Sequence, residues 1–443
     1  PEDRFGTARR DLPAPRAAIR RHRARYDARM TPRPAQPVVH RLDGAVVTER
    51  EHVVPLDHAD PSGPSLVVFT REVVAPGGED RPYLVFFQGG PGIEATRPTS
   101  PPTGWMARAL ADYRVLLLDQ RGTGRSSPVG SKLPGTTAEE GARFLTRFRA
   151  DSIVRDAEAI RRELGVDRWS ILGQSFGGFC AQTYLSIAPE GLREAFITGG
   201  IAPLAMPVRD IYALTYERCR RRNARYFERY PGDRARLREL CRRADDETVL
   251  LPSGDRLSGR RIRALGLALG DSAGFEQLHH ILELPWGSAA LLADLDRSPQ
   301  FARNPLYATL QEAAYADGVA TGWAGAAAYP ADWDEEGLFT GEHLFPWMWE
   351  EIGGLRGHAA AADLLASHPW PRLYDEDRLA RNEVPVATAI YTHDMYVDRD
   401  LAVATATRIG ACRIWETDEY EHNGLRADGE RVLGRLIDLV RGG

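Results

Sequence analysis

A serine lies at the centre of a Gly-x-Ser-x-Gly pattern, between a short apolar run and a helical pattern. Residues 173–177 read Gly-Gln-Ser-Phe-Gly. A tight turn from strand to helix excludes side chains at its flanking positions, which accounts for the glycines, and it holds the hydroxyl at the positive end of the helix. The pattern therefore predicts Ser175 as a covalent nucleophile; the alternative is an ordinary glycine-rich turn that contains a serine.

A serine hydroxyl needs a base to remove its proton, and a carboxylate must orient that base. When a serine occupies this kind of turn, the acid and then the histidine follow it along the chain. Asp394 comes just after the apolar run 386–391, and His422 comes just after a run that ends near Thr417. We predict that both lie at carboxyl ends of strands and form a catalytic triad with Ser175.

Two other residues compete for these roles. Asp398 is the rival acid, but it lies farther from the end of the strand than Asp394. His393 is the rival base, but it directly precedes Asp394, so it is poorly placed to connect that carboxylate with Ser175. The sequence favours Asp394 and His422.

Acyl transfer also requires hydrogen-bond donors for the developing oxyanion. One donor is expected to be the backbone N–H of Phe176, and the second should come from the loop after an early strand. Residues 88–92 read Gln-Gly-Gly-Pro-Gly directly after the apolar run 83–87. We predict Gly90 as the second donor, with Gly89 in reserve; the alternative is a simple tight turn.

A second glycine-containing segment resembles a phosphate-binding loop only superficially. Residues 119–126 read Asp-Gln-Arg-Gly-Thr-Gly-Arg-Ser, without the spacing or the lysine of a P-loop. Asp119 precedes the serine, which is the wrong order for the triad acid. We interpret this segment as support for the wall of the site.

Strands and helices alternate on both sides of a long helical stretch. Parallel strands need crossover connections, usually helices, so this alternation predicts a mostly parallel, doubly wound sheet. Asp151 is expected to cap the first helix and Gly165 to end it. The expected strands are 45–54, 65–74, 83–87, 113–118, 168–172, 195–198, 384–391 and 412–417, and the expected helices are 151–165, 179–187, 400–409 and 429–441.

The helical stretch predicts a cap inserted into the α/β domain. We expect the first part of that domain at 41–203, the cap at 204–371 and the second part at 372–443. The cap should cover the carboxyl ends of the strands, where such sheets bind ligands. Residues 1–40 are expected to form a flexible Arg-rich extension, and the role of the residues before Met30 stays open.

Composition excludes several classes of function. The 443 residues include 43% hydrophobic and 27% charged residues, and no apolar run reaches the length of a membrane span. A net charge of −5 gives no reason to expect nucleic acid or an acidic membrane as a partner. The Arg-rich start lacks the apolar centre of a secretory signal. The oligomeric state stays open, and a monomer is compatible with the sequence.

The four cysteines lack the spacing of a metal site, a redox motif or a disulfide framework. They therefore favour a reducing cytoplasm, although a bridge between Cys219 and Cys241 stays open. No metal or cofactor is implied, because a triad supplies its own acid and base.

Four segments together resemble the proline iminopeptidase (prolyl aminopeptidase) family of α/β-hydrolases, in its larger-cap type. They are the Gly-Gly-Pro-Gly loop, residues 119–126, the Gly-Gln-Ser-Phe-Gly-Gly turn and the closing Glu-Tyr-Glu-His-Asn-Gly-Leu-Arg. The match runs from about Val46 to the end of the chain and is loose in the cap. The resemblance implies an α/β-hydrolase fold and a serine aminopeptidase that releases N-terminal proline, or another small residue, through an acyl-enzyme on Ser175. Its substrate would be a peptide with a free N-terminus.

The resemblance also implies cap glutamates that bind the substrate's free imino group, since a buried cation requires a carboxylate partner. Glu312 is the first candidate and Glu342 the second, with Glu276 and Glu350 as further alternatives. Gln88 stands where many relatives have histidine, which alters how the loop is anchored. Six aromatic residues could line a proline pocket or form the cap core: Trp323, Trp333, Phe339, Phe345, Trp347 and Trp349.

Other functions remain compatible with the same residues. An esterase, a lactonase or an acylase would use the same triad without the cap glutamates. A binding protein could retain the fold without catalysis. Dehalogenases and epoxide hydrolases are disfavoured, because they place aspartate where this chain has Ser175.

Overall fold

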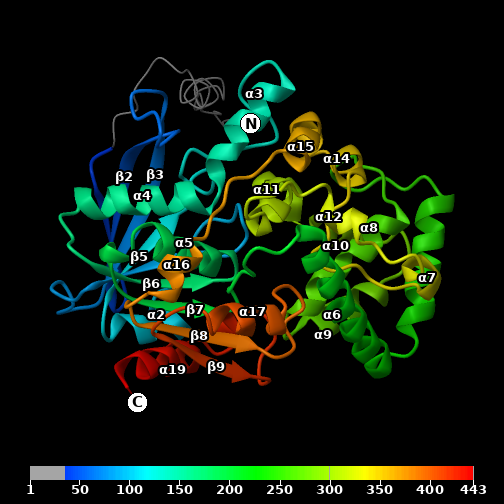
Figure 1. Ribbon diagram of the computed structural model, residues 1–443. Helices are drawn as coiled ribbons and strands as arrows, with labels where there is room; N and C mark the ends of the chain where they lie inside the picture. Colours follow the sequence, from blue (N-terminus) through cyan, green and yellow to red (C-terminus); the bar gives the residue numbers. More distant parts are fainter. Residues whose placement is uncertain (1–34, 299, 443) are drawn as a thin grey trace, which may run out of the picture.

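A nine-stranded sheet forms the centre of the first and last parts of the chain (Figure 1). The computed structural model describes residues 35–298 and 300–442. The spatial order of the strands is β1-β2-β3-β5-β4-β6-β7-β8-β9. The strands are β1 (Val38–Leu42), β2 (Ala45–Pro55), β3 (Ser65–Val74), β4 (Tyr83–Phe87), β5 (Arg114–Asp119), β6 (Trp169–Gln174), β7 (Leu192–Thr198), β8 (Val386–Tyr391) and β9 (Cys412–Thr417).

The pairing between neighbouring strands changes once across the sheet, from antiparallel to parallel. The pairs from β1 to β2, β2 to β3 and β3 to β5 are antiparallel. All later pairs, from β5 through β4 and on to β9, are parallel. The predicted doubly wound, mostly parallel sheet with an inserted helical cap is confirmed.

Both faces of the sheet are covered because successive side chains point to opposite sides. In β4, Val85 and Phe87 pack on one face with helices α4 and α5, whereas Leu84 and Phe86 pack on the other with α2 and α19. The α/β part contains α2 (Gly104–Leu110), α3 (Ala138–Leu145), α4 (Ala150–Glu163), α5 (Phe176–Ile187), α16 (Glu376–Ala380), α17 (Arg399–Ala406), α18 (Gly424–Ala427) and α19 (Gly429–Arg441).

Between β7 and β8 the chain forms a helical cap beside the sheet (Figure 1). Two apolar clusters, separate from those of the sheet, stabilise it. Its helices are α6 (Val208–Arg229), α7 (Asp233–Asp246), α8 (Gly259–Arg263), α9 (Gly274–Leu282), α10 (Ala289–Arg297), α11 (Pro305–Tyr315), α12 (Ala324–Ala327), α13 (Trp333–Glu336), α14 (Trp347–Glu351) and α15 (Ala359–Ala366), with a 3₁₀ segment η4 (Ala264–Gly270).

Local details differ from the sequence-based expectations. The residue that caps α4 is Arg149 rather than Asp151, so the helix begins earlier than predicted. Strand β1 falls partly in the expected extension, and the sequence did not predict α2 or α3. Residues 1–34 of that extension lie outside the described part of the chain.

No helix in the described part of the chain has both the length and the apolar character that crossing a bilayer requires. The four cysteines carry free thiols, so Cys219 and Cys241 form no bridge in this structure.

Candidate active site

Ser175 occupies the sharp turn between β6 and α5. Its backbone adopts φ 55° and ψ −125°, a conformation that residues other than glycine rarely adopt. The N–H of Ser175 donates to the Thr198 carbonyl at 3.0 Å. A Cβ atom at Gly177 would lie 1.9 Å from the Phe87 carbonyl oxygen, and one at Gly173 would lie 2.3 Å from the Gly177 carbonyl oxygen. The two glycines are therefore sterically required, and they keep the serine at the start of a helix.

His422 and Asp394 meet at the carboxyl ends of neighbouring strands. Asp394 follows β8 and His422 follows β9, and the imidazole Nδ1 lies 2.7 Å from Asp394 Oδ2. The other carboxylate oxygen accepts the N–H groups of Tyr396 at 2.9 Å and Val397 at 3.0 Å. Because Nδ1 donates to the carboxylate, Nε2 is left as the proton acceptor that a serine hydroxyl requires.

The environment of His422 favours its protonated form. Burial of the ring opposes the positive charge, but the hydrogen-bonded Asp394 carboxylate outweighs this effect and raises the pKa of His422 above its ordinary value. Glu342 and Asp271 act in the same direction. This charge distribution stabilises the imidazolium that forms when the base accepts a proton.

Ser175 and His422 line one cavity of about 340 Å³ beneath the cap, together with Gly89 and Gly90. Asp394 lies behind the imidazole. A larger cavity, about 660 Å³, lies between α4 and the segment 364–371, and none of the predicted site residues lines it. The smaller cavity is lined by the predicted nucleophile and the predicted base and is therefore the candidate active site.

Neither of the two rival residues lines the cavity that contains Ser175. Asp398 caps α17 by accepting the N–H groups of Asp400 at 2.9 Å and Leu401 at 3.0 Å, and it also pairs with Arg218 Nε at 2.7 Å. His393 is half-buried. The pKa of His393 is lowered mainly by burial and further by the positive charges of Arg225 and Arg222.

The predicted oxyanion donors lie on two sides of the serine. Phe176 is the first residue of α5, so its N–H is one of those that a helix leaves without an internal partner. Gly90 has φ +134°, which lets this loop turn its backbone toward the cavity. A Cβ atom at Gly89 would lie 3.0 Å from Ser175 Cβ, so a side chain there would crowd the nucleophile.

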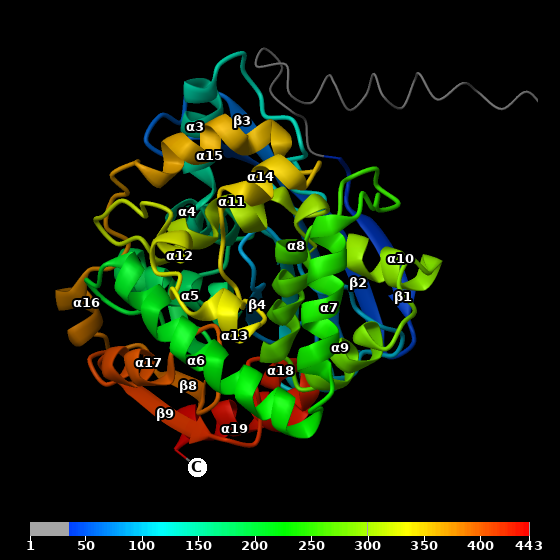
Figure 2. The same ribbon diagram turned by 90° about the vertical axis from the view of Figure 1, so that its right-hand side faces the viewer.

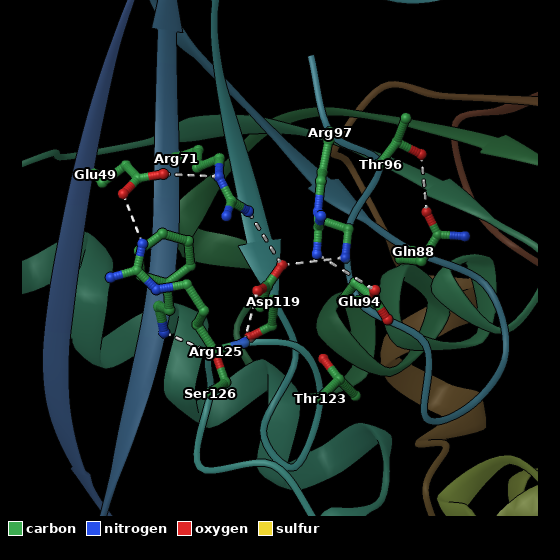
Figure 3. A network of polar contacts seen from close by, with 12 residues as sticks. Glu49, Arg71, Gln88, Glu94, Thr96, Arg97, Asp119, Thr123, Arg125 and Ser126 are labelled. Carbon is green, nitrogen blue, oxygen red and sulfur yellow. Dashed lines mark hydrogen bonds and ion pairs between the residues drawn. The ribbon is translucent and has the colours of Figure 1, made fainter. Parts of the chain in front are cut away.

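The segment after β5 supports this glycine loop. Gln120 Nε2 donates to the Gln88 carbonyl at 2.9 Å, directly before Gly89. The Thr96 hydroxyl donates to the Gln88 side chain at 3.2 Å, and the Ala95 N–H donates to Asp119 Oδ1 at 3.2 Å (Figure 3). Gln88 thus anchors the loop through its backbone carbonyl and its side chain.

Asp119 is also fixed from the side of the sheet. Its Oδ2 accepts the Arg125 N–H at 3.0 Å, while Arg71 lies 3.8 Å from Oδ1 and pairs with Glu49 at 3.1 Å (Figure 3). Burial raises the pKa of Asp119 although these donors oppose the shift. Residues 119–126 therefore position the loop that carries Gly90, and no phosphate is needed to explain them.

Of the two predicted cap glutamates, Glu342 reaches the cavity of Ser175. The Tyr307 hydroxyl donates to Glu342 Oε1. Burial raises the pKa of Glu342 to about 7; Tyr307 and His422 oppose this shift, and Asp394 adds to it. A carboxyl group in this position can become an anion when a cation arrives beside it.

Glu312 lies elsewhere in the cap. Its two oxygens accept the N–H groups of Ala324 at 3.0 Å and Gly325 at 2.9 Å, so it binds the first turn of α12. It lines a small separate cavity rather than the one that contains Ser175. Burial raises the pKa of Glu312.

The remaining candidates also lie outside this cavity. Glu276 pairs with Arg229 at 2.5 Å, and Glu350 is exposed. The six aromatic residues belong to the two apolar clusters of the cap or pack against them, and none lines the cavity. Within residues 35–298 and 300–442, no group of three or more His, Cys, Asp or Glu side chains is arranged to hold a metal ion.

Two tyrosines at the site were not predicted. Tyr307 binds Glu342, and the ring of Tyr396 stands at 86° to the imidazole of His422, with centroids 4.7 Å apart. Both line the cavity. The position of Tyr396, two residues after Asp394, could have identified it from the sequence, whereas no motif marks Tyr307.

Residues 82–288 match the family model described as the alpha/beta hydrolase fold. The chain is 42% identical over 423 residues to a proline iminopeptidase of Aeromonas sobria, covering 92% of this chain and 99% of that protein. It is 34% identical over 416 residues to a proline iminopeptidase of Aspergillus aculeatus, covering 87% and 92%. A solved proline iminopeptidase of Mycobacterium smegmatis is 16% identical with a TM-score of 0.43, covering 88% of this chain and 98% of that one.

Proposed function

The chain belongs to the proline iminopeptidase family of α/β-hydrolases, and from that premise we propose that it is a serine aminopeptidase releasing N-terminal proline from peptides. The observation that carries the proposal is the shared cavity: the nucleophile Ser175, the base His422 and the carboxylate of Glu342 all line it. A carboxylate near the nucleophile can bind the positively charged end of a peptide chain. It therefore favours cleavage after the first residue.

Acylation begins when Ser175 Oγ attacks the carbonyl carbon of the N-terminal proline while His422 Nε2 takes the hydroxyl proton. The N–H groups of Phe176 and Gly90, with Gly89 in reserve, stabilise the oxyanion. The C–N bond then breaks, and the imidazolium gives its proton to the leaving amine. The shortened peptide departs, and prolyl-Ser175 remains.

Deacylation repeats these steps with water. His422 takes a proton from the water molecule, the resulting hydroxide attacks the ester carbonyl, and the same backbone donors stabilise the second tetrahedral intermediate. The imidazolium then returns its proton to Ser175 Oγ, and free proline leaves. Throughout, Asp394 holds the ring orientation and balances its positive charge.

Glu342 binds the charged imino group of the substrate. A nearby cation favours the ionised carboxylate, so substrate binding lowers the pKa that burial has raised. The Tyr307 hydroxyl donates a hydrogen bond to this carboxylate and fixes its position. The unbridged thiols also support a location in a reducing cytoplasm.

Hydrolysis of proline p-nitroanilide tests the proposal. The wild type should release nitroaniline, Ser175→Ala should not, and N-acetyl-proline p-nitroanilide should react far more slowly because its ring nitrogen carries no charge. Brisk hydrolysis of p-nitrophenyl acetate with no reaction on any aminoacyl amide would instead identify an esterase.

A further inference from the structure

The segment that carries the catalytic histidine is bound to the cap. We call residues 421–426 the histidine segment and residues 269–272 the cap turn. The His422 N–H donates to the Gly270 carbonyl at 3.2 Å. The backbone N–H and the hydroxyl of Ser272 donate to Asn423 Oδ1 at 3.1 and 2.7 Å. Figure 2 shows α6 and α9 of the cap next to α18, which follows His422.

Arg222, on the cap helix α6, connects the two segments. Its Nε donates to the Leu269 carbonyl at 2.9 Å, and its Nη1 donates to Glu421 Oε1 at 2.6 Å. The guanidinium lies 4.4 Å from the ring centroid of Phe275. A planar guanidinium can serve two acceptors in fixed directions, so one side chain sets the spacing between the cap turn and the residue before His422.

The contact lies in a poorly solvated place. Arg222 is 6% exposed, and burial lowers its pKa although Glu421 opposes the shift. Burial likewise raises the pKa of Glu421, against the effect of Arg222 and Arg225 and with that of Asp394. Breaking such a pair leaves a buried charge without its partner, which costs much more than breaking an exposed pair such as Arg426 with Asp271.

A second cap contact acts on the same imidazole. The ring of Tyr396 packs edge-on against His422, and its hydroxyl donates to the Leu267 carbonyl in η4. The cap segment from Leu267 to Ser272 therefore contacts His422 directly at its backbone N–H and indirectly through Tyr396. A shift of this segment would move the imidazole relative to Asp394 and Ser175.

We propose that Arg222 is a positioning residue, which couples the cap to His422 by holding Glu421 and the Leu269 carbonyl at a fixed separation. The proposal rests on the triad described under the proposed function. One part of the cap thus positions the catalytic base, and another part binds the substrate. An enzyme without Arg222 should bind substrate normally and activate Ser175 poorly.

The test measures how fast a fluorophosphonate labels Ser175, because that reaction needs the activated serine and does not need peptide recognition. Arg222→Gln is compared with wild type and with Arg261→Gln, a matched control. Arg261 is another cap arginine, 3% exposed, which also contacts a backbone carbonyl (Glu351, 3.2 Å) and a carboxylate (Asp255, 3.5 Å) but not the histidine segment. Circular dichroism verifies that each variant is folded.

Arg222→Gln should label at least about tenfold more slowly than wild type, since an ångström-scale misplacement of a catalytic group costs up to about 10²-fold. Arg261→Gln should stay within about twofold of wild type, because its partners lie outside the histidine segment and the position of His422 is unchanged. With proline p-nitroanilide, the loss should appear in kcat and leave KM almost unchanged. Arg222→Lys, which keeps the charge but lacks the two-acceptor geometry, should recover only part of the rate.

The pH profile separates positioning from a general loss of packing. If His422 loses its close contact with Asp394, the pKa of the imidazole falls, and the acid limb of the labelling rate moves to lower pH. Asp394, Glu342 and Asp271 each raise the pKa of this ring, and the substitution replaces none of them. A packing defect would lower stability without moving this limb.

Two results would overturn the proposal in distinguishable ways. Labelling of Arg222→Gln at the wild-type rate and with the wild-type pH profile would reject the positioning role alone. If Ser175 of the wild-type enzyme is never labelled, the proposed triad is rejected, and the positioning role of Arg222 is rejected with it. If Arg222→Gln does not fold, Glu421→Ala provides the same comparison, because it removes the acceptor of Arg222 Nη1 and leaves the guanidinium in place.

Discussion

The Glu342 carboxylate and the His422 imidazole line the same cavity, and each acts on the pKa of the other. The imidazole lowers the pKa of Glu342, although burial keeps it at about 7, and the carboxylate raises that of His422. The group proposed to bind substrate is therefore electrostatically linked to the group proposed to perform catalysis.

Glu342→Gln tests the substrate-binding role. Removing the anion while keeping the shape should lower kcat/KM for proline p-nitroanilide by about 100-fold, which corresponds to about 3 kcal/mol, because the substrate cation loses its partner. Hydrolysis of a neutral ester should change little. Glu350→Gln, at an exposed cap glutamate, is the control. Equal losses on the charged and the neutral substrate would contradict the assignment.

On the acid side, the pH dependence of the activity should reflect the protonation of two groups. His422 must be neutral to accept the serine proton, and Glu342 must be ionised to bind the cation; both pKa values are raised. Activity should therefore fall as the pH drops through about 7, with a slope steeper than one proton gives. In Glu342→Gln the remaining limb should have a one-proton slope. An unchanged slope in that variant would exclude Glu342 from the titration.

Asp394→Asn and Asp398→Asn distinguish the two candidate acids. Asp394→Asn should lower kcat by roughly 10³- to 10⁴-fold, since the histidine loses the carboxylate that fixes its tautomer. Asp398→Asn should change kcat by less than about threefold, because asparagine also caps helices well. Steady-state kinetics would show the reverse order if Asp398 were the triad acid.

Gln120→Ala tests the support of the glycine loop. Loss of the hydrogen bond to the Gln88 carbonyl should loosen the loop and lower kcat by about tenfold, less than the roughly 10²- to 10³-fold cost of losing an oxyanion donor outright. Gln88→Ala retains the accepting carbonyl and should lose less. If Gln88→Ala is the more damaging substitution, the side chain of Gln88 rather than its carbonyl anchors the loop.

Sequence reasoning was most successful where local geometry dictates residue type. The turn at Ser175 excludes side chains at Gly173 and Gly177, so the Gly-x-Ser-x-Gly motif identifies this turn from the sequence alone. The apolar run before Asp394 located a strand end correctly, because buried parallel strands such as β8 have continuous apolar sequence. The strand before His422, β9, lies at the edge of the sheet and is less buried, so its sequence is mixed. The order of strands and the antiparallel edge required tertiary pairing that no local pattern records.

The cap was much less predictable. Glu312, in α11, is buried and Glu342, in the loop after α13, is partly buried, and only the packing of these two segments places Glu342 in the cavity of Ser175. The capping of α4 by Arg149 rather than Asp151 shows the same limit on a smaller scale. Residue type cannot specify which neighbour a side chain meets across the fold.

Mass spectrometry of a short peptide with N-terminal proline gives the decisive observation. The wild type should release one proline and leave the rest of the peptide intact, and a brief reaction quenched in acid should show enzyme that is heavier by one prolyl group on Ser175. Ser175→Ala should produce neither. Cleavage at internal bonds, or proline release by Ser175→Ala at the wild-type rate, would contradict the proposed acyl-enzyme aminopeptidase.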